Sequence, residues 1–108
     1  MPTYHKLVRD FIPTIIEKSG KLCSTKVLSE DEYIVEVNRK MHEELAEYEA
    51  AETPDDAIEE LADLLELLHA AAMSQGFSVE ELEKIRQQKA EKRGGFEERI
   101  FLIDVEDE

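Results

Sequence analysis

Two short acidic motifs are the part of this sequence whose residue types and spacing suit chemistry. Glu44 and Glu47 lie three residues apart, and so do Glu60 and Asp63 further along the chain. Residues three apart on an α-helix are neighbours on one face, so each pair can hold one cation between its carboxylates. Glu43, directly before the first pair, is a further candidate.

Bringing four carboxylates together costs free energy unless a cation joins them. Two carboxylates about 6 Å apart at an effective dielectric constant of about 20 repel by roughly 3 kcal/mol, so four cost on the order of 10 kcal/mol. That cost rivals the total stability of a small domain. Either the side chains splay into water as an ordinary solvated surface, or a divalent cation neutralises them. A set of oxygen ligands without cysteine or histidine suits Mg²⁺, with Mn²⁺ as an alternative.

The helical positions of these acids predict which of them are buried. At about 100° per residue, Glu44 lies about 60° from the centre of the apolar stripe of its helix, so we expect it to be partly buried. Glu43 lies nearly opposite that stripe and is expected to face water unless a partner chain reaches it. Glu60 is set in an apolar surface, and Asp63 lies at its edge. The short link at residues 50–55 predicts an antiparallel hairpin, in which the four paired acids converge.

Four helices are expected to position these residues. The start and stop signals place them from the segment around Val8 to Gly20, from Ser29 to about Glu52, from Thr53 to near Gly76 and from Ser78 to Gly94. Ser29 and Ser78 are each followed three residues later by glutamate, which is the capping-box pattern of a helix start. Residues 22–28 and 99–105 read as two short strands that could pair. We therefore predict one all-α domain over residues 1–108, a compact bundle of about four helices with a possible two-stranded β appendage.

The composition limits the classes of partner. The chain has 108 residues, of which 42% are hydrophobic and 6% aromatic, and a net charge of −14. Residues 29–83 hold eighteen acidic and two basic residues, whereas the flanking segments are basic. Such a chain is repelled by nucleic acid, so we expect no nucleic-acid partner. The flanking charges are either ordinary ion-pair partners or an anion site beside a cation site.

Cellular location and assembly can also be predicted. No apolar run reaches the roughly 20 residues of a membrane span, and the start of the chain lacks a signal peptide, so we expect a cytoplasmic protein without a membrane partner. Cys23 is the lone cysteine and is expected to be a buried or idle thiol. The predicted third helix is apolar over more than half its circumference, which favours a homo-oligomer, a dimer or tetramer, over a monomer with this helix at its centre.

Glu66 and His69 offer a second kind of metal site. These residues form a Glu-x-x-His element of the type that di-iron helical bundles use. Such bundles need two of these elements, and one chain supplies a single copy, so a homodimer would have to provide the other. A histidine satisfied within the core is the alternative reading of His69.

The acidic motifs resemble the signature of the all-α nucleoside triphosphate pyrophosphohydrolases, which comprise MazG-like and phosphoribosyl-ATP pyrophosphohydrolase-like proteins. That signature, Glu-Glu-x-x-Glu followed by Glu-x-x-Asp, is matched by residues 43–47 and 60–63. The segments Tyr4–Pro13 and Lys89–Phe96 are similar to the phosphoribosyl-ATP pyrophosphohydrolase-like branch. The resemblance therefore spans nearly the whole chain.

The resemblance implies magnesium-dependent cleavage of a nucleotide between its α and β phosphates, which yields a monophosphate and pyrophosphate. The metal ligands it implies are Glu44, Glu47, Glu60 and Asp63. The general base stays open among Glu43, Glu44 and Glu47. Because a triphosphate needs cationic groups beside so acidic a surface, the candidate phosphate contacts are Lys6, Arg9, Lys89 and Arg93.

Three functions follow as hypotheses. The first is a nucleoside triphosphate pyrophosphohydrolase, with a possible role in clearing unwanted nucleotides. The alternatives are cleavage of phosphoribosyl-ATP in histidine synthesis and a non-catalytic acidic helical protein that acts through dimerisation. No sequence feature marks a pocket for the base or sugar.

Overall fold

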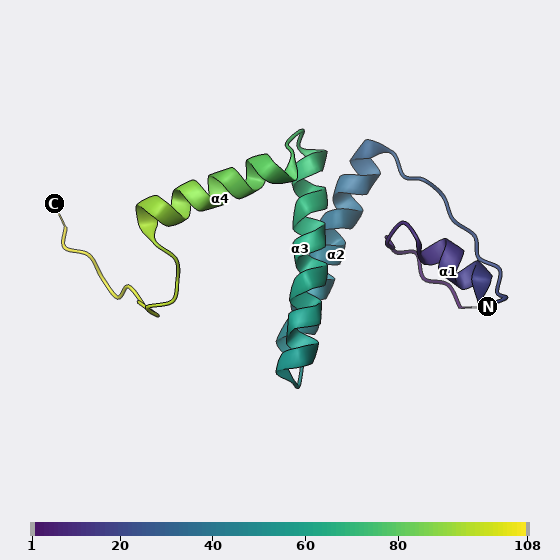
Figure 1. Ribbon diagram of the computed structural model, residues 1–108, viewed down its shortest axis with the longest axis horizontal. Helices are drawn as coiled ribbons and strands as arrows, with labels where there is room; N and C mark the ends of the chain where they lie inside the picture. Colours follow the sequence, from purple (N-terminus) through teal and green to yellow (C-terminus); the bar gives the residue numbers. More distant parts are fainter. Residues whose placement is uncertain (1, 108) are drawn as a thin grey trace.

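A hairpin of two long helices forms the centre of the molecule (Figure 1). The computed structural model describes residues 2–107, which form α1 (Ile12–Lys18), α2 (Glu30–Ala50), α3 (Pro54–Ser74) and α4 (Val79–Arg93). Helices α2 and α3 are joined by residues 51–53 and lie side by side, with the most extensive helix–helix contact in the described chain. The prediction of an all-α fold with four helices is confirmed.

The helix starts follow the local capping signals. The Ser29 hydroxyl accepts a hydrogen bond of 3.2 Å from the Glu32 backbone N–H, and the Glu32 carboxylate accepts one of 3.2 Å from the Ser29 N–H. The same reciprocal pair joins Ser78 and Glu81. These bonds satisfy backbone donors that have no partner inside the helix, which is why α2 and α4 begin where the sequence predicts.

Helix α3 begins with a simple N-cap, Thr53, instead of a reciprocal capping box. Thr53 accepts a 3.1 Å hydrogen bond from the Asp56 N–H, and Pro54 occupies the first turn of α3, where its missing N–H costs nothing. The close spacing of the end of α2 and this cap forces the chain to reverse within a few residues. The expected antiparallel hairpin is therefore present.

The first helix is shorter than the spacing of its apolar residues predicts. It begins at Ile12, so Val8 lies outside it. Pro13 falls in the first turn of α1, the part of a helix that tolerates proline, and a start near Val8 would have placed it in the interior. Within the described chain, α1 packs against none of the other helices.

The β appendage is absent from residues 2–107, which contain no strand. Residues 22–28 precede α2 and residues 99–105 follow α4, and Figure 1 shows these two segments on opposite sides of the hairpin. A strand needs a neighbour to satisfy its backbone hydrogen bonds, and the hairpin separates these two within one chain. The prediction that they pair with each other in this chain is wrong.

The described chain is extended around its hairpin. Helix α4 leaves the end of α3 and projects away from α2, and the radius of gyration is 18.5 Å, against roughly 13 Å for a compact domain of this length. Among the described residues, Val37 is the one fully buried hydrophobic side chain, 1% exposed. Apolar side chains are exposed along α3 and both ends of the chain, among them Ile58, Leu65, Met73, Leu22, Val27, Ile100, Phe101 and Ile103.

None of the helices in the described part of the chain is both long and apolar enough to cross a bilayer.

Candidate metal centre

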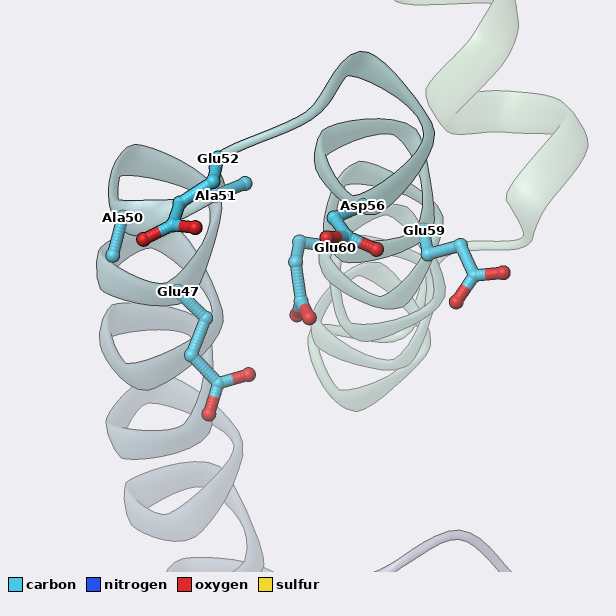
Figure 2. Close-up of a pocket in the computed structure, with 7 residues that line it drawn as sticks. All are labelled: Glu47, Ala50, Ala51, Glu52, Asp56, Glu59 and Glu60. Atoms are coloured by element: carbon cyan, nitrogen blue, oxygen red, sulfur yellow. The ribbon is translucent and has the colours of Figure 1, made fainter.

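Three carboxylates from two helices converge inside the hairpin. Ligand oxygens of Glu44 and Glu47 on α2 and of Glu60 on α3 all lie within 4.8 Å of one another. Figure 2 shows Glu47 and Glu60 reaching into the space between the two helices. The predicted convergence of the two acidic motifs is present for these three acids.

Glu44 is the most buried member of the group. It shares one stripe of α2 with Val37, seven residues earlier, and these two are the buried residues of that helix. Glu44 is only 7% exposed, so its burial exceeds the partial burial expected from the helical positions. Its Oε2 atom is enclosed and has no hydrogen-bond donor among the described residues. A buried carboxylate oxygen without a donor is costly, and such an atom calls for a partner.

Glu60 faces Glu44 from the opposite helix, and it too has a carboxylate oxygen without a hydrogen-bond donor among the described residues. This oxygen, Oε2, is enclosed. A proton that it can share with Glu44, followed by burial and by the nearby Glu47, raises the pKa of Glu60 to about 7. The pair therefore resists holding two full negative charges side by side.

Lys40 is a functional candidate that the sequence analysis missed. Its Nζ lies 3.8 Å from Glu44 Oε1, one helical turn earlier on α2, and the Lys40 side chain is only 18% exposed. A lysine four residues before a glutamate places the two groups on one helix face, and that spacing was the available signal. Lys40 offsets part of the charge of Glu44 but leaves Oε2 free.

Asp63 stands apart from the three-carboxylate group because it has another partner. Arg9 Nη2 donates a hydrogen bond of 2.7 Å to Asp63 Oδ1, across 54 positions of sequence. The contact raises the pKa of Arg9, and the charges of Glu66 and Glu44 add to the effect. An ion pair with both side chains about half exposed contributes about 0–1 kcal/mol. The fourth predicted ligand is thus held by an arginine.

Glu43 lies outside the carboxylate group. It is exposed, as the helical positions predict, and it is not among the acids whose ligand oxygens converge in the described chain. Glu47 is also exposed but belongs to the group.

Among the described residues, no ion pair joins the other three predicted phosphate contacts to the carboxylates. Lys6 is exposed and its Nζ lies 5.5 Å from the centre of the Tyr4 ring. Lys89 and Arg93 are exposed on α4, which projects away from the α2–α3 hairpin (Figure 1). Arg93 borders a separate hollow of about 560 Å³ made by residues 93–100. Of the four predicted basic residues, Arg9 is thus the one joined to a predicted metal ligand.

The residues of the alternative di-iron element, Glu66 and His69, do not form part of a ligand cluster in the described chain. Both residues are on α3. Cys23 is an exposed free thiol whose Sγ lies 4.0 Å from the Pro13 carbonyl oxygen.

A hollow of about 380 Å³ lies beside the carboxylate group, next to the link between α2 and α3 (Figure 2). Five of its seven lining residues are acidic, and none is basic. The lining residues are Glu47, Ala50, Ala51, Glu52, Asp56, Glu59 and Glu60. Phosphate would be repelled on this side of the group, whereas Lys40 and Arg9 make the surroundings of Glu44 and Asp63 less negative.

The three converging acids fit a hard divalent cation. All donors are carboxylate oxygens, and two of the oxygens are enclosed without hydrogen-bond donors among the described residues. Mg²⁺ and Mn²⁺ prefer oxygen ligands and commonly bind through a few carboxylates, water and substrate phosphates. A cation between α2 and α3 would give Glu44 Oε2 and Glu60 Oε2 the partner that each lacks.

Part of the chain is similar in sequence to a known protein. The chain is 46% identical over 54 residues to an uncharacterized protein of Mycolicibacterium smegmatis. The match covers 50% of this chain and 55% of the relative, so the chain spans about half of that protein. No family model matches the chain, and no solved structure matches it.

Proposed function

We propose that this chain is a magnesium-dependent nucleoside triphosphate pyrophosphohydrolase that cleaves between the α and β phosphates. The observation that carries the proposal is the enclosed Glu44 Oε2, which has no hydrogen-bond donor among the described residues, on a carboxylate that converges with Glu47 and Glu60 inside the hairpin. The resemblance of residues 43–47 and 60–63 to the pyrophosphohydrolase signature supplies the reaction. Nucleoside triphosphates are made and used in the cytoplasm, which is therefore the proposed place of action.

The three converging carboxylates are the proposed metal ligands. Glu44 and Glu60 would hold the cation from opposite helices, and Glu47 would complete the ligand group. When bound, Mg²⁺ supplies charge neutralisation for the phosphate oxygens and lowers the pKa of a nearby water. Lys40 keeps Glu44 in place through its ion pair.

Glu47 fits the role of proton acceptor best among the three candidates. Glu44 is buried and paired with Lys40, and Glu43 lies outside the converging group. Glu47 belongs to the group and is also exposed, so its carboxylate is accessible to a water from which it could accept a proton.

The distribution of charge indicates how a triphosphate would lie. The hollow next to the α2–α3 link is lined by acids and repels phosphate. Arg9 and Lys40 border the other end of the carboxylate group, at Asp63 and Glu44. We therefore orient the departing pyrophosphate toward Arg9, since a guanidinium can bind two phosphate oxygens at once.

We also propose that the active form is a homo-oligomer. The accessible surface is 10154 Å², whereas a compact monomer of 12.4 kDa exposes about 6,100 Å². If a dimer buried this excess of about 4,000 Å² on each chain, the interface would total about 8,000 Å², at the large end of permanent interfaces. The exposed apolar residues of α3 and of both chain ends are the surface that a second copy would cover. The non-catalytic dimer shares this property, so assembly alone does not separate the two functions.

Pyrophosphate release tests the proposal directly. A panel of nucleoside triphosphates and phosphoribosyl-ATP, each with and without Mg²⁺, should identify a substrate from which the protein releases pyrophosphate. Glu60→Gln should lower that rate by roughly 10²-fold, because it removes one of the charges that hold the cation. Glu49→Gln is the matched control, since Glu49 is an exposed acid of α2 outside the group.

The alternatives have distinct outcomes in the same assay. Preference for phosphoribosyl-ATP over free triphosphates would assign the chain to histidine synthesis. An oligomeric protein without turnover of any nucleotide would favour the non-catalytic function. Equal rates for the wild type and Glu60→Gln would remove the carboxylate group from the mechanism.

A further inference from the structure

We propose that Arg9 is an exchangeable placeholder for the cation at Asp63: it holds this carboxylate while the metal is absent and releases it when the metal binds. The freed guanidinium then becomes available to the phosphates of the substrate. This inference rests on the proposed function, because it concerns the same site, and it adds a step that couples metal loading to substrate binding.

Asp63 is placed to join the three converging acids but is bound by Arg9 instead. Asp63 lies three residues after Glu60, so its side chain is on the same face of α3 and one turn away. Its Oδ1 is engaged by Arg9 Nη2 at 2.7 Å, and Asp63 is not a member of the converging group in the described chain. The acid that completes the quartet is therefore turned toward an arginine, whereas the other three lie within 4.8 Å of one another.

The Arg9–Asp63 ion pair is exposed enough to be displaced by a cation. The Arg9 and Asp63 side chains are 55% and 42% exposed, so water can replace either partner at small cost. Glu44, in contrast, is more than nine-tenths buried, and its Oε2 has no hydrogen-bond donor among the described residues. A cation held by the three converging acids would meet a fourth carboxylate, Asp63, whose present partner is easily displaced.

Arg9 belongs to an N-terminal segment that can move away from Asp63. Arg9 precedes α1, and α1 packs against no other helix of the described chain. The ion pair with Asp63 is, among the described residues, the side-chain bond that joins this N-terminal segment to α3. Loss of that bond frees the segment without disturbing the packing of α2 on α3, so Arg9 can move while the carboxylates stay in place.

Manganese binding measures the exchange without any turnover. In a calorimetric titration of the full chain with Mn²⁺ alone, Arg9→Gln should bind two- to fivefold more tightly than the wild type, because a competitor for Asp63 is gone. Arg9→Lys retains the charge and should lie between them. Arg86→Gln is the matched control, since Arg86 forms an equally exposed ion pair with Glu83 on α4 and should leave the affinity unchanged.

A double-mutant cycle separates exchange from a general effect of charge. In the Asp63→Asn background, Arg9→Gln should no longer change Mn²⁺ affinity, since Arg9 acts through Asp63. Equal tightening in both backgrounds would show that Arg9 acts only through its electric field and would overturn the exchange. Unchanged or weaker Mn²⁺ binding by Arg9→Gln in the wild-type background would also overturn it.

Trypsin cleavage after Arg9 gives a second readout that does not depend on the affinity of the Asp63→Asn protein. Mg²⁺ should raise the cleavage rate of the wild-type Arg9–Asp10 bond several-fold, and Asp63→Asn should show the raised rate without Mg²⁺. Cleavage after Arg86 serves as the internal control. A rate independent of Mg²⁺ in a protein that binds Mn²⁺ would overturn the release of Arg9.

The two proposals fail in different ways. If the wild type and Glu60→Gln bind Mn²⁺ equally weakly, the metal centre itself is refuted, and the exchange with it. If Mn²⁺ binds the wild type and is lost in Glu60→Gln, but Arg9→Gln has no effect, the proposed function stands and only the placeholder role is refuted.

Discussion

Lys40 Nζ lies 3.8 Å from Glu44 Oε1, and this pair places a lysine within the carboxylate group of the hairpin. Lys40→Met should lower the free energy of unfolding by about 1–3 kcal/mol at pH 8, because it leaves a buried carboxylate without its cationic partner. Urea denaturation measures the change. Arg39→Gln, which removes an exposed partner of Glu36 on the same helix, should change stability by less than about 1 kcal/mol. Equal effects of the two substitutions would contradict the importance of burial at Lys40.

The raised pKa of Glu60 predicts an unusual pH dependence of stability. The folded pKa is about 7, above the ordinary value of 4.5, so the folded state binds more protons than the unfolded state between these values. The contribution of Glu60 to stability therefore falls as the pH rises from about 4.5 to about 7, and it stays low above that range. The melting temperature without metal should drop across this window relative to Glu60→Gln, which lacks the titrating group. Parallel profiles of the two proteins would exclude a protonated Glu60.

Metal binding should be linked to the same proton. A cation displaces the proton from Glu60, so affinity for Mg²⁺ should rise as the pH increases toward about 7 and level off above it. Calorimetric titrations in two buffers of different ionisation enthalpy count the protons released. An affinity that is constant between pH 5.5 and pH 8 would be incompatible with Glu60 as a ligand.

Divalent ions should stabilise the folded chain. At a free Mg²⁺ concentration ten times its Kd, binding adds about 1.4 kcal/mol, which for a domain of this size raises the melting temperature by several degrees. Differential scanning fluorimetry with Mg²⁺, and again after addition of a chelator, measures the shift. Glu44→Gln should abolish the shift, whereas Glu49→Gln should retain it. A shift of equal size in Glu44→Gln would place the bound ion elsewhere.

The proposed homo-oligomer predicts a mass above 12.4 kDa in solution. Leu65 is 52% exposed on α3, and Leu65→Glu should shift the protein toward the monomer by placing a charge in the apolar interface. Light scattering coupled to size-exclusion chromatography at micromolar concentration gives the mass. A wild-type monomer at these concentrations would refute the assembly.

The helices were predictable because their boundaries depend on neighbouring residues. Ser29 with Glu32, and Ser78 with Glu81, form the capping boxes that their spacing predicts. The link after Ala50 forces the hairpin, so the convergence of Glu44 and Glu60 also follows from local signals.

The remaining features depend on contacts between distant parts of the chain. Arg9 and Asp63 are separated by 54 positions, and no periodicity relates them. Residues 22–28 and 99–105 have the composition of strands, but the hairpin separates them, and composition cannot reveal such a separation. Lys40 is different, because its spacing from Glu44 was visible and only its burial was not.

Val37 has a consequence for how the protein folds. With a single aliphatic side chain enclosed in the described part of the chain, the hairpin offers little apolar burial by itself. Under the proposed assembly, folding and association become one equilibrium, and the unfolded fraction depends on total concentration. Dilution alone should then melt the protein, and its thermal midpoint should climb steadily as the sample is concentrated.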